Sequence, residues 1–114
     1  MTHYMNLNPK PYELILKGIK TIELRLLDEK RKQIKIGDTL IFKNADNYSE
    51  QLTCIVKELH VFDSFDELYK LLPLEKCGYL PTELENASPR DMEIYYPQEK
   101  QRLYGVVGIE LELV

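Results

Sequence analysis

Apolar and polar positions alternate along several short stretches of the chain, a pattern that predicts β-strands with one buried face. In TIELRL, residues 21–26, the even-numbered positions are apolar and the odd-numbered ones are polar. The stretch 51–62 alternates in the same way, and 34–42 combines a Gly-Asp turn with β-branched and aromatic residues. Residues 104–114 form a last strand, with apolar odd-numbered positions on one face and Glu110 and Glu112 on the other.

Helix signals lie between these strands. A short helix is predicted within 8–18, where apolar residues fall at helical spacing. Ser64 and Glu67 have capping-box spacing, which predicts a second helix after Ser64, and a third short helix begins at Ser88 and stops near Pro97. Four or more strands with a few short helices predict a mixed α+β fold. We expect a small, curved or barrel-like sheet with the helices packed at its rim.

Length and composition limit the classes of protein to consider. We expect a single domain over 1–114, because 44% hydrophobic and 30% charged residues are the balance of a globular protein. The formal net charge is −4, so any contact with nucleic acid requires a local basic patch or a pocket. No apolar run reaches the ~20 residues of a membrane-spanning helix. The first residues lack a signal-peptide pattern, so no membrane contact and a cytoplasmic location are expected.

The cysteines and histidines give no metal-binding signal. Cys54 and Cys77 form no CxxC pair, and free thiols are expected for them. His3 and His60 each stand alone, without a second ligand at metal-binding spacing. The chain also lacks a glycine-rich phosphate loop. We therefore expect neither a metal nor a cofactor.

The polar face of the strand at 21–26 has two interpretations. Glu23 and Arg25 lie two residues apart on it, with Lys20 just before the strand. They could form an ordinary solvated pair, worth under about 1 kcal/mol, or they could line a polar pocket that binds a ligand. The charged loop that follows supplies Lys30 and Arg31. A solvated loop is the commoner outcome for such a run, and a basic rim that contacts phosphates is the alternative.

Two of these residues, together with Gly18, also match a family pattern. Gly18, Lys20 and Arg25 fit G-x-K-x-x-x-x-R, and a Gly-Asp turn at 37–38 leads into the next strand. In this context the chain resembles the ASCH domain, a branch of the PUA-like β-barrel superfamily. The likeness covers nearly the whole chain, since 64–72 and 104–114 fall where such domains have a helix and a closing strand. The resemblance implies a PUA-like β-barrel whose cleft is lined by the lysine and arginine, with a role in RNA binding, RNA metabolism or translation.

A small subgroup of this family hydrolyses N4-acetylcytidine with a lysine, a threonine and a glutamate, and the match to it is partial. The lysine corresponds to Lys20, but the expected threonine is Glu23, and Thr21 occupies the position next to the lysine. The glutamate has no secure counterpart; Glu85 is the better candidate and Glu83 the other. A carboxylate has no hydroxyl proton for the lysine to take and so cannot act as that threonine does, although it can activate water as a general base.

Three functional hypotheses follow. In the first, the domain binds RNA or a nucleotide-like ligand; the expected contacts are Lys20, Thr21, Glu23, Arg25, Lys30 and Arg31. In the second, it is an amidohydrolase of N4-acetylcytidine or a related acylated nucleoside, with Lys20, Glu23 and Glu85 in acid-base roles. In the third, it is a protein-interaction module with an inert cleft. Tyr79, Tyr95 and Tyr96 could stack on a base or form half-buried core edges, and we favour the core edge for Tyr95.

Overall fold

The structure, a computed structural model that describes residues 1–114, is built on five strands. They are β1 (Thr2–Leu7), β2 (Ile22–Leu26), β3 (Thr39–Asn44), β4 (Asn47–Phe62) and β5 (Val106–Leu113). Their order across the sheet is β1-β3-β4-β5-β2, so β1 and β2 are the two edges. β1 runs parallel to β3, and all other neighbours are antiparallel.

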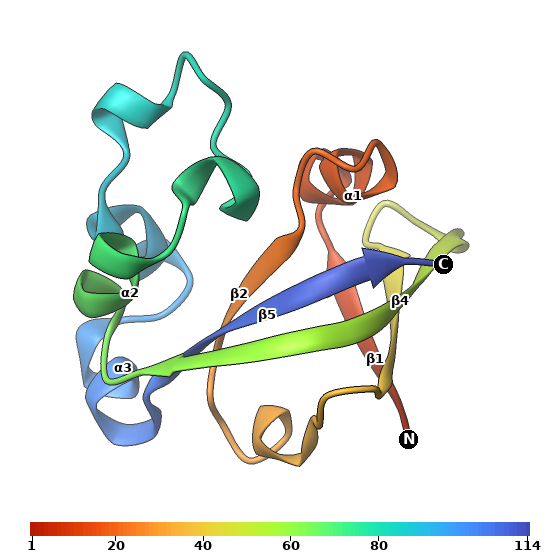
Figure 1. Cartoon of the computed structure of the whole chain (residues 1–114), viewed down its shortest axis with the longest axis horizontal. Coiled ribbons are helices and arrows are strands. Elements are labelled where there is room, and N and C mark those ends of the chain that lie inside the picture. The colour runs from red at the N-terminus through yellow and green to blue at the C-terminus, as the bar shows by residue number, and fades with distance from the viewer.

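Three α-helices and four short 3₁₀ helices connect the strands. They are α1 (Pro9–Leu16), η1 (Arg31–Gln33), α2 (Phe65–Leu71), η2 (Leu74–Cys77), η3 (Leu84–Asn86), η4 (Pro89–Ile94) and α3 (Gln98–Tyr104). Figure 1 shows α2, α3 and the turns between them gathered at one end of β4 and β5, whereas α1 lies apart from them. No helix is long and apolar enough to cross a membrane. This mixed α+β architecture confirms the predicted fold class.

The sheet curls until its two edge strands approach each other. β4 pairs with β3 along its first part and with β5 along its second, and its register shifts between Val56 and Glu58. Such a bulge bends a strand and increases its twist. At the open side of the curl, Arg25 Nη2 on β2 donates a hydrogen bond to the Asn6 carbonyl on β1 at 2.9 Å. The sheet is thus a half-barrel with a seam between β1 and β2.

Two hydrophobic clusters pack on opposite faces of the sheet. The larger contains Met5, Leu7, Tyr12, Ile15, Ile34, Leu40, Phe42, Leu52, Cys54, Val56, Val107, Ile109 and Leu111. The smaller contains Ile22, Leu24, Leu26, Phe65, Leu68, Cys77 and Val106. Val106 and Val107 are neighbours in sequence but belong to different clusters, so the first part of β5 is buried on both faces. The sequence pattern assigned β5 only one buried face; α2 covers the other. Cys54 and Cys77 are free, as expected.

Some elements differ from the sequence-based expectation. β1 was not predicted, because its inward positions include a polar residue, His3, and this hid the alternation. The segment after Ser88 forms a 3₁₀ helix, η4, capped by a reciprocal pair of bonds between Ser88 and Asp91. α3 was also missed. Pro97 suggested a stop, whereas its fixed backbone angle also suits the residue that precedes a helix.

Candidate functional site

Three charged side chains meet on the inner side of β2. The Glu23 carboxylate lies 2.7 Å from Lys20 Nζ through Oε1 and 2.8 Å from Arg25 Nε through Oε2. Glu23 is only 4% exposed, and the side chains of Lys20 and Arg25 are also largely buried. This arrangement, which we call the charged triplet, rules out a solvated strand face. All three residues line a cavity instead.

The strand register explains why the triplet is buried. Paired residues on antiparallel strands point to the same face of a sheet. Glu23 pairs with Ile109, and Arg25 pairs with Val107, so both point to the face that carries the larger hydrophobic cluster. The apolar side chains of β2 point to the opposite face, where the smaller cluster and α2 cover them. Both faces of β2 are therefore covered by other parts of the chain, and its polar residues are buried as well as its apolar ones.

The triplet also shifts the pKa values of its members. Burial alone would raise the pKa of Glu23, but the charges and hydrogen bonds of Lys20 and Arg25 outweigh it and lower the pKa below its ordinary value. Burial alone would lower the pKa of Arg25, whereas Glu23 and the hydroxyl of Tyr96 raise it. Glu23 is therefore ionised at neutral pH and is a weak base.

The lowered pKa of Glu23 predicts a pH-dependent stability. The stabilisation by the ionised carboxylate is fully present above the ordinary pKa of a glutamate, about 4, and is lost as the pH falls through the lowered value. The difference in unfolding free energy between the wild type and Glu23→Gln should therefore be constant near neutrality and narrow below about pH 4. Urea denaturation from pH 7 to pH 2 measures it. A difference that stays undiminished at pH 2 would contradict this assignment.

A cleft opens above the triplet, between α1 and the helical segment that follows β4. Its volume is about 550 Å³. From β1, α1 and the turns after β1 and β3 it is lined by Asn6, Leu7, Asn8, Lys10, Pro11, Leu14 and Ala45. From β2 and the helical segment it is lined by Lys20, Glu23, Leu24, Arg25, Tyr69, Cys77, Gly78, Tyr79, Glu83, Asp91, Met92, Ile94, Tyr95 and Tyr96. A space of this size with mixed polar and apolar walls suits a small organic ligand.

Gly78 creates room for the lysine of the triplet. Its φ is +110°, a region that favours glycine, and a Cβ at this position would lie 3.2 Å from Lys20 Cδ. Any other residue at 78 would therefore strain the backbone and displace the Lys20 side chain. Gly78 terminates η2, and the preceding Lys76 carbonyl accepts from the Thr21 N–H at 2.9 Å. The turn thus holds the beginning of β2 against the helical segment.

A chain of hydrogen bonds forms one wall of the cleft. The Tyr79 hydroxyl donates to Asp91 Oδ2 at 2.7 Å and lies 2.7 Å from the Tyr69 hydroxyl. Asp91 Oδ2 also accepts from the Ser88 N–H at 3.2 Å, within the cap of η4. Because the tyrosine rings meet edge to face and their hydroxyls are bonded, this wall is fixed before any ligand binds.

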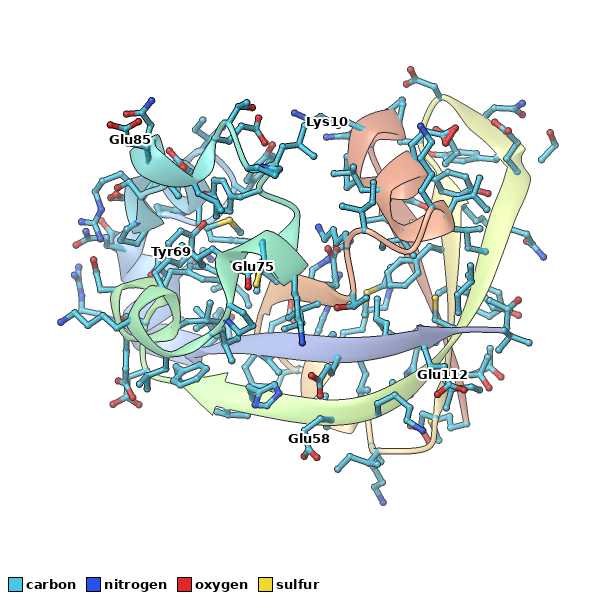
Figure 2. All side chains as sticks on the ribbon, turned by 45° about the horizontal axis from the view of Figure 1, so that its top comes forward. Lys10, Glu58, Tyr69, Glu75, Glu85 and Glu112 are labelled. Carbon is cyan, nitrogen blue, oxygen red and sulfur yellow. The ribbon has the colours of Figure 1, made fainter.

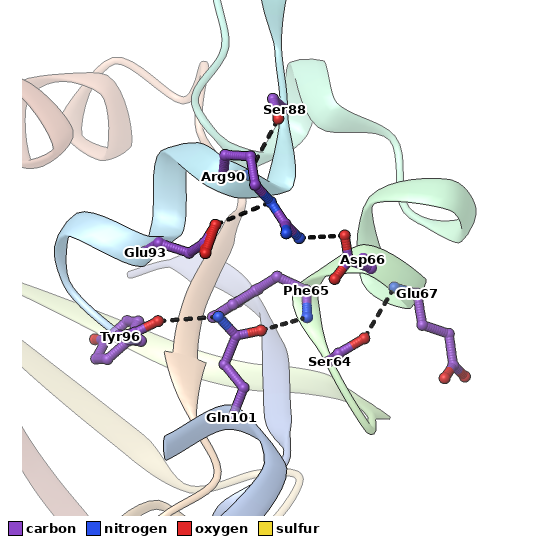
Figure 3. Close-up of polar contacts among 9 residues, drawn as sticks. All are labelled: Ser64, Phe65, Asp66, Glu67, Ser88, Arg90, Glu93, Tyr96 and Gln101. Atoms are coloured by element: carbon purple, nitrogen blue, oxygen red, sulfur yellow. Dashed lines mark hydrogen bonds and ion pairs between the residues drawn. The ribbon is translucent and has the colours of Figure 1, made fainter. Parts of the chain in front are cut away.

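The lip of the cleft is apolar and exposed. Ile94 is 84% exposed and Tyr95 is 61% exposed, although both line the cleft. The expectation that Tyr95 forms a half-buried core edge is wrong. Tyr96 occupies that position instead, with its ring stacked on Phe65 at 5.9 Å between centroids. Gln101 holds the Tyr96 backbone, since its Nε2 donates to the Tyr96 carbonyl and its Oε1 accepts from the Phe65 N–H (Figure 3).

The structure brings some predicted residues together and separates others. Lys30 and Arg31 do not line the cleft but an adjoining cavity, which shares Arg25 with it. Thr21 is half-buried and lines neither cavity. Glu85 is exposed on η3, and Figure 2 places it at the outer side of the helical segment. Glu83 lines the cleft instead, where it forms an ion pair with Lys10 at 3.2 Å.

Other lining residues were not anticipated. The Asn6 carbonyl comes from β1, a strand that the sequence pattern did not reveal. Gly78 has no side chain, so no pattern in the sequence points to its close approach to Lys20. Cys77 lines the cleft, and burial raises the pKa of its thiol to about 12, so it is not a thiolate nucleophile. No group of three or more His, Cys, Asp or Glu side chains is placed to hold a metal ion.

The chain resembles known proteins in sequence and in fold. The sequence profile of the ASCH domain matches residues 5–114. The crystal structure of hypothetical protein PH0355 has a TM-score of 0.83 at 36% identity, with 100% of both chains covered. The solution structure of PF0455 from Pyrococcus furiosus has a TM-score of 0.73 at 36% identity, covering 100% of this chain and 98% of that one.

A more distant structural neighbour shares only the fold. Protein EF3133 from Enterococcus faecalis V583 has a TM-score of 0.58 at 14% identity, covering 100% of this chain and 81% of that one. At that identity the likeness concerns the fold alone. No curated protein matches the chain.

Proposed function

The chain belongs to the ASCH domain family, and on this premise we propose that its cleft binds RNA or a nucleotide-like ligand through a nucleoside. The observation that carries the proposal is the charged triplet, Lys20, Glu23 and Arg25, buried at the floor of a cleft of about 550 Å³. A role in RNA metabolism or translation follows from the same premise and is part of the proposal.

The triplet has spare hydrogen-bonding capacity for the polar edge of a base. A carboxylate offers about four acceptor positions, and Glu23 uses two of them for Lys20 and Arg25. It can still accept from an exocyclic amine such as that of cytosine. The Lys20 ammonium has three donors, of which one is used for Glu23. The ion pairs already hold Lys20, Glu23 and Arg25 in place, so these side chains lose little conformational entropy when a ligand binds.

The apolar lip supplies the second part of nucleoside recognition. Bases that leave a stack are commonly held against aromatic side chains, and stacking contributes about 1–3 kcal/mol per base. Tyr95 offers an exposed ring at the cleft, next to Tyr96 at 6.3 Å between centroids. We assign the base to the space between this lip and the charged triplet.

Replacement of Tyr95 by alanine should therefore weaken nucleoside and RNA binding about tenfold without a loss of stability. Calorimetric titration with the four ribonucleosides and with a short single-stranded RNA of mixed sequence measures the affinity. Tyr48→Ala is a matched control, because Tyr48 is also 61% exposed and lines neither cavity. Its affinity should equal that of the wild type.

Two results would contradict the proposed nucleoside binding or the role of Tyr95 in it. If the wild type binds none of these ligands, and their addition shifts no resonance near residues 20–25, the nucleoside proposal is wrong and an interaction module is favoured. Equal losses in Tyr95→Ala and Tyr48→Ala would show that the lip has no specific part in binding.

The second candidate function is hydrolysis of N4-acetylcytidine or a related acylated nucleoside. One observation favours it: Lys20 and Glu23 lie 2.7 Å apart in a cleft of suitable volume. Against it, Glu23 has a lowered pKa and Glu85 lies outside the cleft. A chromatographic assay for cytidine decides between the two functions, with Lys20→Ala as the control. Cytidine released by the wild type and not by Lys20→Ala would replace the binding proposal with the enzymatic one.

A further inference from the structure

A second cavity adjoins the cleft on the other side of Arg25. Its volume is about 360 Å³, and it is lined by Tyr4, Met5, Asn6, Arg25, Lys30, Arg31 and Lys43. Asn6 and Arg25 line both spaces, so the two cavities meet at the seam between β1 and β2. A ligand bound in the cleft therefore has a route past Arg25 into this second cavity.

The charge of the second cavity contrasts with that of the chain. Its lining includes four cationic side chains and no carboxylate, in a protein whose formal net charge is −4. Arg25 is paired with Glu23, and Arg31 is paired with Asp28 at 3.2 Å. Lys30 and Lys43 form no ion pair, and Lys43 Nζ lies 5.6 Å from the centroid of the Tyr4 ring. Two positive charges thus remain without a protein counter-charge.

Arg31 has hydrogen-bonding capacity that Asp28 does not use. Asp28 fixes this residue twice, because Oδ1 accepts from its backbone N–H at 3.0 Å and Oδ2 accepts from Nη1 at 3.2 Å. The Nε of the same guanidinium is buried and has no hydrogen-bond partner. A buried donor without an acceptor costs about 1–3 kcal/mol. Because Arg31 lines the cavity, an anionic ligand there would add a charge-assisted interaction with this guanidinium.

We infer that this second cavity is a phosphate subsite, and that the ligand of the cleft is a phosphorylated nucleoside. The inference rests on the proposed function, since the nucleoside occupies the cleft and its phosphate crosses Arg25 to reach Lys30, Arg31 and Lys43. A phosphate monoester carries about −1.5 to −2 charges at pH 7, which matches the two lysines that lack ion pairs. A phosphodiester of RNA brings one negative charge to the same place.

Paired titrations test the subsite. The four ribonucleosides are compared with their 5′- and 3′-monophosphates and with dinucleotides that contain one phosphodiester. We expect the phosphorylated ligands to bind the wild type about tenfold or more tightly than the nucleosides, with a difference that shrinks as salt is added. A larger gain for the monophosphates assigns the subsite to free nucleotides, and a larger gain for the dinucleotides assigns it to RNA.

Three lysine variants locate the effect. Lys30→Gln and Lys43→Gln should each reduce the gain from phosphate several-fold and leave the affinity for nucleosides unchanged. Lys100→Gln is the matched control, since Lys100 also lies over a tyrosine ring, that of Tyr104 at 6.0 Å, but lines neither cavity. It should change neither affinity.

The results also separate the two proposals. If nucleosides bind but phosphate adds nothing, or if Lys100→Gln weakens nucleotide binding as much as Lys43→Gln, the phosphate subsite is wrong and the nucleoside site stands. If nucleosides and nucleotides both fail to bind, both proposals are overturned.

Discussion

Replacement of Glu23 by glutamine should lower the free energy of unfolding at neutral pH by about 3–5 kcal/mol. The side chain keeps its volume, but Lys20 and Arg25 then remain as two largely buried cations without a counter-charge. Removal of one partner from a buried ion pair is far more costly than removal of the whole pair, because the remaining charge is left desolvated. Chemical denaturation monitored by circular dichroism measures the change.

A control on the neighbouring strand separates burial from charge. Glu112 on β5 also pairs with a lysine, Lys57 at 3.3 Å, but both side chains are more than half exposed. Glu112→Gln should cost less than about 1 kcal/mol. The double variant Lys20→Met, Glu23→Gln should lose less than the sum of its single changes, since it removes a cation together with its partner. Equal costs for Glu23→Gln and Glu112→Gln would show that the triplet is as well solvated as a surface pair.

The second large effect is expected at Gln101, which is 2% exposed. Its amide joins the start of α2 to the loop before α3, with bonds of 3.1 Å from the Phe65 N–H and 2.9 Å to the Tyr96 carbonyl. Gln101→Leu fills the same space but leaves a donor and an acceptor unpaired in the interior. At about 1–3 kcal/mol for each such group, the expected loss is about 2–6 kcal/mol.

Gln101→Leu should also weaken ligand binding, because Tyr96 lies beside Arg25 at the cleft. Gln98→Leu on the same helix is the matched control, since Gln98 is half-exposed and makes no side-chain hydrogen bond. It should leave both stability and affinity near the wild-type values. If Gln101→Leu is as stable as Gln98→Leu, the two bonds do not hold the helical segment together.

Local pattern predicted the mixed class of the fold and which residues of β2 share a face, whereas the barrel-like sheet was expected mainly from the resemblance to the ASCH domain. The alternation in β2 has the predicted phase: Leu24 belongs to a buried cluster and Glu23 points the other way. The local sequence pattern could not show that the polar face of β2 is also buried. That depends on the curl of the sheet and on α1, which together cover the second face.

The rest of the site depends on contacts between distant segments. Lys43 lines the same cavity as Lys30 and Arg31 because β3 pairs with β1, and β1 had no clear strand pattern. Glu83 rather than Glu85 lines the cleft because a turn places its carboxylate on the Leu80 N–H at 2.8 Å, directed inward. Two glutamates separated by one residue in an irregular segment cannot be distinguished by spacing.

The seam between β1 and β2 has one further consequence, for association between copies of the chain. An open sheet presents two edges whose unpaired N–H and C=O groups can add strands from other molecules. Here the curl turns both edges toward each other, and the bond from Arg25 to the Asn6 carbonyl spans the gap. The contact that brings Arg25 to the cleft thus also occupies one backbone carbonyl of the β1 edge that an added strand would need.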